Sequence, residues 1–323
     1  MYVDNRCKSE RRIGVGRYIL KRLALTVITL FIIITVTFFF IHLLPGTPLQ
    51  NEEKLPDEVR EQILKEYGLD QPLHIQYVQY LGALLKGDLG KSLVYEGRDI
   101  DEMLWERFQV SAAVGVQAVI IGVIFGTILG VLSGLYQGKW IDHFSTSFSV
   151  LGVSVPNFVF AGLLSYVVGV KLGWLPPALW GTYQHTILPS LSLSVVVIAQ
   201  IARFVRTEMI DVLKQDYIKT AKAKGLKAST ILVKHALRNA MLPAITVLGP
   251  LTVNVITGSL VVEKIFSIPG MGSMFVDSIL QNDYTAILGI TIFYGGLIVA
   301  VIFLIDLLYG LIDPRIRLTG AKE

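Results

Sequence analysis

The chain has 323 residues, a formal net charge of +4 at pH 7, 53% hydrophobic residues and only 17% charged residues. A soluble domain carries about 25% charged residues, and the deficit here comes from long charge-free runs that indicate segments inside a bilayer. Cys7 is the only cysteine and the five histidines are scattered, so we expect no intrachain disulfide, metal site or bound cofactor.

The first apolar run covers residues 23–44 and follows a polar leader at residues 1–22. It is longer than the core of a signal peptide, and it ends in Leu44-Pro45-Gly46 without a small-residue cleavage pattern. At about 1.5 Å per residue, a helix of this length crosses a hydrocarbon core of about 30 Å. We therefore predict a retained transmembrane helix.

Residues 45–107 form a long polar loop that we expect to contain helical parts. Residues 52–67 are charged and helix-prone after Pro56, and Leu73, Tyr77 and Leu81 recur at helical spacing. Two arrangements of that apolar face stay open, along the membrane surface or packed against the spans.

The core that we predict at residues 108–312 holds five further charge-poor stretches, and each is expected to form one helix. The stretches are Val110–Gly138, Phe144–Val170, Leu172–Ala202, Asn239–Val262 and Tyr284–Ile305. The third of these opens with an aromatic, polar segment, so its span should begin near Ile187. The predicted fold is an all-α polytopic membrane protein with six transmembrane helices.

One face of the second predicted span is nearly bare backbone, because glycine recurs every four residues at Gly122, Gly126, Gly130 and Gly134. Such a face lets another helix approach closely. The partner is either another helix of this chain or a moving or intersubunit contact, and the sequence leaves both open.

The distribution of Lys and Arg predicts the orientation of the spans. The leader carries seven such residues, the loop 203–238 carries nine against three acids, and the tail 313–323 carries three. These segments alternate with the long loop 45–107. We therefore expect both termini and the loop 203–238 in the cytoplasm, and the loop 45–107 outside the cell.

The loop 203–238 contains an apolar stripe with spacings of three, four and four residues, formed by Ile210, Leu213, Tyr217 and Ala221. We predict one amphipathic helix that ends at Gly225, with Ser229 or Thr230 as the cap of the next helix. Periodicity alone leaves three interpretations open: a lipid-surface helix, a plain connector, or a docking site for a soluble partner.

The loop also carries two motifs, DYIKTAKAKGL at 216–226 and HALRNAMLP at 235–243, which resemble the permeases of oligopeptide, dipeptide and nickel ABC importers. Against the general "EAA" loop of import permeases, the chain departs at Lys219, Thr220, His235 and Arg238, but this branch has such residues there. The resemblance extends to LDQPL at 69–73, GDLGKS at 87–92, SVPNF at 154–158, EKIFSIPGMG at 263–272 and DLLYGLIDPRIR at 306–317.

The resemblance implies the fold of a type I ABC importer permease, in the subunit type with a long first extracellular loop. It implies ATP-driven import of oligopeptides or dipeptides in a bacterial cell membrane, with nickel or another small solute as the alternative. The implied partners are a second homologous permease subunit, two cytoplasmic ATPase subunits and an extracellular or periplasmic substrate-binding protein. The residues implied in coupling to the ATPases are Asp216, Tyr217, Thr220, Ala221, Ala223, Lys224 and Gly225.

The remaining candidates carry less information. Asn254 and Asn157 are polar residues in apolar stretches and are candidates for the translocation pathway, with hydrogen bonding between helices as the alternative. Gly90-Lys91-Ser92 resembles the end of a phosphate-binding loop but lacks the required upstream glycine. We therefore expect no ATP binding, no catalysis and no nucleic-acid partner. A secondary transporter or a membrane enzyme are the rivals from other classes.

Overall fold

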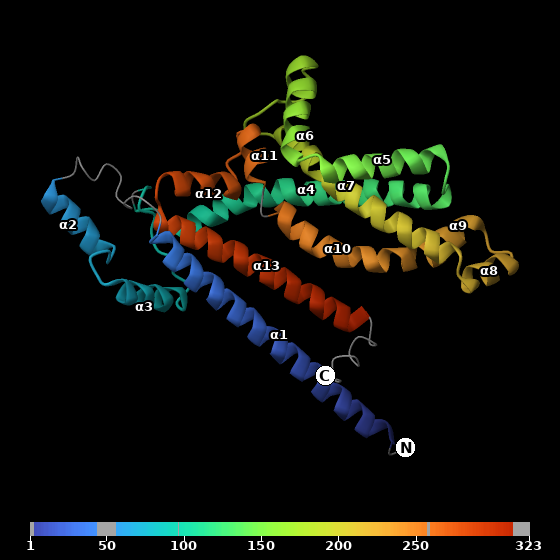
Figure 1. Cartoon of the computed structure of the whole chain (residues 1–323), viewed down its shortest axis with the longest axis horizontal. Coiled ribbons are helices and arrows are strands. Elements are labelled where there is room, and N and C mark those ends of the chain that lie inside the picture. Colours follow the sequence, from blue (N-terminus) through green and yellow to red (C-terminus); the bar gives the residue numbers. More distant parts are fainter. Residues whose placement is uncertain (1–2, 44–55, 96, 257–258, 313–323) are drawn as a thin grey trace. The chain divides into compact units, whose positions relative to one another are not determined.

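The computed structural model describes residues 3–43, 56–95, 97–256 and 259–312, and these residues are mostly helical (Figure 1). Their backbone divides into two compact units, residues 1–106 with 274–323 and residues 107–273. The long helix α4 (Ile100–Leu135) and the short helix α12 (Met271–Leu280) each contribute residues to both units.

The first unit is built on α1 (Val3–Ile41) and α13 (Tyr284–Ile312), which pack along each other. A Cβ atom at Gly295 of α13 would lie 3.2 Å from Ile33 Cδ1 of α1, so the missing side chain lets the two helices approach. Helix α1 begins inside the polar leader, which means that leader and apolar run form one continuous helix.

Two short helices follow the first span, α2 (Asp57–Glu66) and α3 (Leu73–Leu84). Each begins directly after a proline, Pro56 or Pro72, which suits a helix start because proline fixes φ. Both predicted helical parts of this loop are confirmed, although residues 52–55 of the expected α2 segment lie outside the described residues.

Helix α3 packs against the first span rather than presenting a free apolar face. The hydroxyl of Tyr77 lies 2.6 Å from Thr35 Oγ1 of α1. The ring of Phe38 lies 5.2 Å from that of Tyr77 and 5.7 Å from that of Tyr80, measured between centroids. Of the two arrangements left open for this face, packing on a span is therefore the one observed.

Gly90-Lys91-Ser92, the segment that resembles the end of a phosphate-binding loop, contacts the start of α13 through Ser92 in the first unit. The Ser92 hydroxyl is fully buried and donates a short hydrogen bond to the buried carboxylate of Asp283. The same carboxylate accepts the backbone N–H of Leu93 and of Ala286 in the first turn of α13. Asp283 thus caps α13 and ties the loop to the start of this helix.

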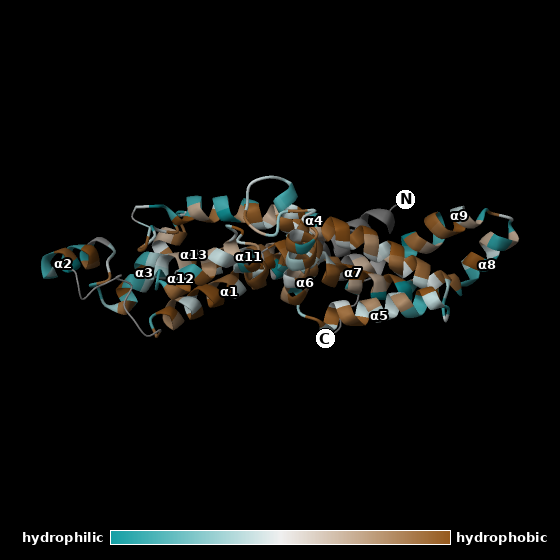
Figure 2. Cartoon of the chain, turned by 90° about the horizontal axis from the view of Figure 1, so that it is seen from above, coloured by the Kyte–Doolittle hydropathy of each residue, from teal (hydrophilic) through white to brown (hydrophobic). Residues whose placement is uncertain are grey.

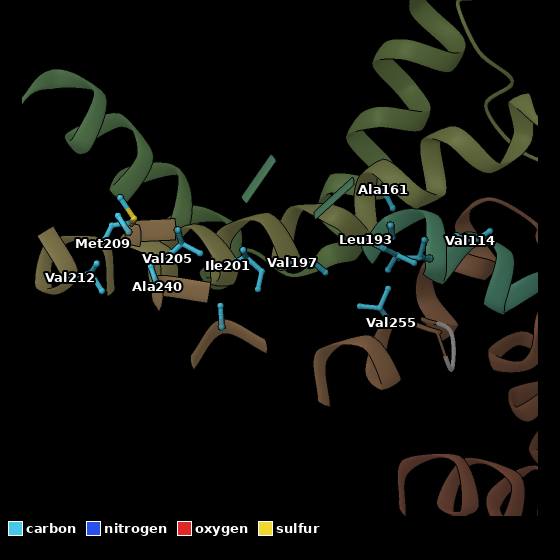
Figure 3. Packing of buried hydrophobic residues seen from close by; sticks show 14 of the residues in the cluster. Val114, Ala161, Leu193, Val197, Ile201, Val205, Met209, Val212, Ala240 and Val255 are labelled. Atoms are coloured by element: carbon cyan, nitrogen blue, oxygen red, sulfur yellow. The ribbon is translucent and has the colours of Figure 1, made fainter. Parts of the chain in front are cut away.

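In the second unit, the glycine face of α4 packs on α7 (Gln184–Leu213). A Cβ atom at Gly126 would lie 2.8 Å from Ile201 Cβ, and one at Gly134 would lie 2.6 Å from Met209 Cβ. Figure 3 shows Val197, Ile201, Val205 and Met209 along the length of α7. The glycine face is therefore used within the chain, which is the first of the two alternatives stated for it.

The predicted single helix over residues 144–170 is wrong. The structure has α5 (Trp140–Ser154), then α6 (Asn157–Leu164) with a π-helical continuation, η2 (Ser165–Lys171), and the two parts are bent by 102°. Val155 is extended, with φ −88° and ψ 125°, because it precedes Pro156.

The predicted single helix over residues 239–262 is also wrong. Helix α10 (Arg238–Ile256) packs on α7, and α11 (Leu260–Ile265) starts separately after Ser259. The backbone of Ser259 is extended, with φ −102° and ψ 103°, whereas residues 257–258 lie outside the described part.

Five segments are long and apolar enough to cross a membrane, one of which runs over residues 257–258 outside the described part, and the bent α5–α6 pair makes a sixth if it counts as one broken span. The five are Arg22–Ile41, Ile100–Leu135, Gln184–Leu213, Leu248–Ile265 and Tyr284–Leu304. Figure 2 shows hydrophobic residues along most of α1 and α6, in contrast to the hydrophilic residues of α2 and α8 (Asp216–Ala223). The all-α membrane fold predicted from the sequence is confirmed.

Candidate functional site

The predicted coupling segment is a short helix, α8, joined to the end of α7 by a turn at Lys214 and Gln215. Gln215 is extended, with φ −68° and ψ 149°, so the helix direction changes before Asp216. The predicted continuous helix from Ile210 to Gly225 is therefore wrong, and its apolar stripe is divided between two helices.

The turn brings a different apolar face of α8 onto the core of the second unit. Ile218 and Ala221 are buried, with exposed fractions of 0% and 6%, and both belong to the same hydrophobic cluster as Ile231. Tyr217, which belongs to the same predicted stripe as Ala221, is 42% exposed. The buried face of α8 is therefore formed by Ile218 and Ala221, and only Ala221 of these belongs to the predicted stripe.

Gly225 ends α8 as the sequence predicts. Its φ is +72°, and its N–H donates to the carbonyl of Lys222 at 2.9 Å. The next N–H, of Leu226, reaches back to the carbonyl of Ala221 at 3.3 Å. These two bonds form a Schellman motif, which satisfies two carbonyls at the helix end and needs a residue that tolerates positive φ.

The outer face of α8 is accessible and carries most of the predicted coupling residues. Exposed on it are Asp216, Tyr217, Thr220, Ala223 and Lys224, together with Gly225 beyond the helix end. Ala221 is the exception, because its methyl group faces the protein interior. A partner surface can therefore approach the backbone at Ala223 and Gly225, but not at Ala221.

Two polar contacts on this segment differ in what they can contribute. Lys219 Nζ lies 2.8 Å from Asp216 Oδ1, but these side chains are 70% and 94% exposed, so solvent screens the pair. Asn239 Nδ2 donates to Tyr217 Oη at 3.0 Å and to the His235 carbonyl at 2.8 Å. The hydrogen bond between Asn239 and Tyr217 links α8 to the start of α10.

The next helix does not begin at the predicted caps. Helix α9 (Ala228–Thr230) starts after Lys227, whose extended backbone serves as the N-cap without a side-chain hydrogen bond. A π-helical segment, η3 (Ile231–Leu237), follows and packs against α8. Ser229 and Thr230 both lie within α9, and Thr230, which precedes η3, has helical backbone angles and makes no capping side-chain hydrogen bond. Their predicted capping role is therefore wrong.

The two pathway candidates occupy different environments. Asn157 is the first residue of α6 and is half-buried beside the break at Pro156. Asn254 lies in α10 with an exposed side chain. The structure gives each of them a place but no substrate, so their function stays a prediction.

Sequence reasoning missed two buried carboxylates in the second unit. Asp142 in α5 is 3% exposed and is paired with Arg206 of α7. Glu263 in α11 is 5% exposed, accepts from the Ser111 hydroxyl at 2.7 Å and from the Ser273 N–H at 2.9 Å, and so caps α12 from the preceding helix. The motif EKIFSIPGMG was the available signal for Glu263.

The glycines of that motif are explained by the same carboxylate. A Cβ atom at Gly270 would overlap the carboxylate of Glu263, and one at Gly272 would lie 3.1 Å from Glu263 Oε2. Among the described residues, no three His, Cys, Asp or Glu side chains gather where they could hold a metal ion.

Two family descriptions match the chain. Residues 122–318 match "Binding-protein-dependent transport system inner membrane component", and residues 15–95 match the N-terminal part of such membrane components. The chain is 44% identical over 303 residues to the dipeptide transport system permease protein DppB of Bacillus subtilis, covering 94% of this chain and 98% of that protein. It is 45% identical over 303 residues to the oligopeptide transport system permease protein OppB of Haemophilus influenzae, covering 93% and 99%.

A solved structure supports the fold independently of these sequence matches. The crystal structure of an amino acid ABC transporter with histidines superposes with a TM-score of 0.52 at 16% identity, covering 66% of this chain and 95% of that one. At this identity the match speaks for the fold alone. Together with the family matches over most of the chain, it shows that the protein is a multi-pass inner-membrane permease of the binding-protein-dependent ABC importer family.

Proposed function

We propose that this chain is one membrane subunit of an ATP-driven importer of oligopeptides or dipeptides. The observation that carries the proposal is the match over more than nine-tenths of the chain to permeases named for dipeptide and oligopeptide transport. The match also covers nearly the full length of those relatives, so it concerns the whole permease and not one part of it. It forms half of a translocation pathway with a second, similar permease subunit.

In this proposal the cytoplasmic ATPase subunits dock on the exposed face of α8. The face combines a small residue, Ala223, with the exposed Lys224 and the Schellman end at Gly225. A small side chain lets a partner approach the helix backbone, and an exposed lysine steers an acidic surface toward it. This assignment requires that the loop 203–238 and both termini lie in the cytoplasm.

The chain itself holds no catalytic site in this account. ATP hydrolysis belongs to the two ATPase subunits, and closure of these subunits moves α8. The movement changes the spans from an inward-facing to an outward-facing arrangement. A substrate-binding protein outside the cytoplasm delivers the peptide to the opposite side.

The docking surface is tested by one substitution with a matched control. Ala223→Trp adds a large side chain on the exposed face of α8 and leaves the buried Ile218 and Ala221 untouched. We expect normal membrane insertion, loss of the ATPase subunits on co-purification, and loss of uptake of a labelled dipeptide.

The control is Val78→Trp in α3, where the side chain is 66% exposed and lies outside the loop 203–238. This variant should keep the ATPase subunits on co-purification. Full ATPase binding and full uptake by Ala223→Trp would show that α8 is not the docking element.

A further inference from the structure

The buried carboxylate of Asp142 accepts four hydrogen bonds in the second unit. Arg206 Nε donates to Oδ1 at 2.5 Å and Arg206 Nη2 donates to Oδ2 at 2.9 Å, which makes a bidentate pair. The Ser133 hydroxyl donates to Oδ1 at 2.5 Å, and the Gly138 N–H donates to Oδ2 at 2.8 Å. Every strong acceptor direction of this carboxylate is therefore used.

These four bonds tie three helices together at one point. Ser133 lies in the last turn of α4, Gly138 lies in the turn before α5, and Arg206 lies in the last third of α7. The helices also approach closely elsewhere, and Ser145 Oγ of α5 donates to the Leu129 carbonyl of α4 at 3.5 Å. The α4 glycines pack on α7, and a Cβ atom at Gly152 of α5 would lie 2.8 Å from Ala199 Cβ of α7.

The clamped helices end at the two places where the chain changes direction. Helix α7 continues into α8 through the turn at Lys214 and Gln215. Helix α5 leads to Val155 and Pro156, where the chain bends by 102° into α6. A rigid body made of α4, α5 and α7 therefore reaches from the exposed helix α8 to the bend that precedes α6.

We propose that the Asp142–Arg206 pair is a positioning clamp that makes α4, α5 and α7 move as one body when α8 is displaced. The inference rests on the proposed function, because it assigns the path by which movement of α8 reaches the broken span. The pair joins the buried Asp142 to the 29% exposed Arg206, and such a pair often adds no net stability compared with well-packed apolar residues. A bidentate arginine fixes orientation and helix register in a way that apolar packing does not.

Without the clamp, α8 moves without carrying the α4–α5 hairpin with it. The glycine contacts still hold the helices near each other, so the subunit assembles with its partners. ATP is then hydrolysed by the docked ATPase subunits while fewer substrate molecules cross per ATP. This coupling ratio distinguishes a positioning role from a merely structural one, because a structural defect lowers the amount of complex and leaves the ratio unchanged.

The test uses the complete complex in proteoliposomes and a labelled mixture of peptides of two to six residues. We expect Asp142→Asn to lower the number of peptides transported per ATP by about fivefold or more, the lower end of typical coupling effects. Arg206→Lys keeps the charge but removes the fork, so it should give a smaller loss in the same direction. The control is Glu106→Gln, which breaks the 2.8 Å ion pair between Arg98, 42% exposed, and Glu106, 61% exposed. It should leave the number of peptides transported per ATP unchanged.

A second measurement needs neither substrate nor ATPase. Spin labels at Thr146 of α5 and Lys219 of α8, both exposed, report the distance between the two helices in the full chain with Cys7 replaced by serine. We expect a narrow distance distribution that Asp142→Asn broadens and Glu106→Gln does not.

The two arms separate the inference from the function on which it rests. An unchanged coupling ratio or an unbroadened distribution in Asp142→Asn would overturn the clamp. If the unsubstituted complex takes up none of the labelled peptides, the proposed substrate class fails. The spin-label distances then still decide whether Asp142 holds α5 to the body that carries α8.

Discussion

The end of α8 offers a substitution whose cost comes from the backbone alone. Gly225 has φ +72°, and a Cβ atom there would meet no other atom within 4 Å. Gly225→Ala therefore introduces no steric clash, but it places an L-residue in the left-handed region at a cost of about 1 kcal/mol. Gly225→Asn should cost less, because asparagine tolerates this region better than alanine does.

The cost should appear as local opening of the Schellman motif. The amide of Leu226, which donates to the Ala221 carbonyl, is protected by that motif. A loss of about 1 kcal/mol corresponds to roughly fivefold faster hydrogen exchange at a locally opening site. We expect the order Ala, Asn, Gly from fastest to slowest, measured by exchange mass spectrometry on peptides covering residues 216–227.

Gly173→Ala is the matched control for this series. Gly173 has φ +64°, and a Cβ atom there also meets nothing within 4 Å, but it lies between η2 and α7 rather than at α8. It should leave both the exchange of α8 and the retention of ATPase subunits unchanged. The reasoning is refuted if Gly225→Ala exchanges at the rate of the unsubstituted chain.

Three further outcomes follow from the structure. An impermeant thiol reagent should label Val78→Cys in intact cells, since this residue is exposed on α3, and should label Leu226→Cys only after the cells are opened. The reverse labelling pattern would contradict the predicted orientation of the spans. Gly270→Ala should lower the melting temperature of the detergent-solubilised chain, because its Cβ would collide with the carboxylate of Glu263, and an unchanged melting temperature would mean that this carboxylate shifts freely. Ser92→Ala should destabilise the start of α13 by about 1–3 kcal/mol through the lost hydrogen bond to a buried carboxylate, which thermal unfolding of the full chain measures, with no effect counting against the anchoring of this loop.

Hydropathy was sufficient for the spans because a bilayer demands long apolar helices whatever the details of packing. It could not show that two of the stretches are broken. The proline at 156 was a readable sign, since the residue before a proline avoids the helical region. The break at Ser259 has a weaker sign, because it follows Gly258 and a single glycine inside an apolar stretch is often tolerated within a helix.

The coupling segment shows where periodicity fails. The helix end at Gly225 was predicted correctly because a glycine ends a helix through its own backbone conformation, which depends only on the local sequence. The turn at Lys214 and Gln215 has a tertiary cause, since it allows Ile218 and Ala221 to return to the core. A stripe counted through that turn therefore joined residues of two different helices and left the buried Ile218 unnoticed.

The burial of these carboxylates could not be predicted from the sequence, because it also depends on tertiary contacts. Asp142 and Asp283 stand beside apolar stretches and resemble ordinary loop charges in the sequence. Their partners Arg206 and Ser92 are 64 and 191 residues away along the chain. Only the folded arrangement brings each carboxylate to the donors that make its burial tolerable.

The energy source of transport tests the central claim most directly. Proteoliposomes containing this chain with its partner permease, ATPase subunits and binding protein are supplied with a labelled dipeptide and no ion gradient. The account predicts peptide transport that requires ATP on the side of the membrane where α8 lies, that stops with a non-hydrolysable ATP analogue, and that persists with a protonophore. Peptide transport driven by an imposed proton gradient in the absence of ATP would contradict it.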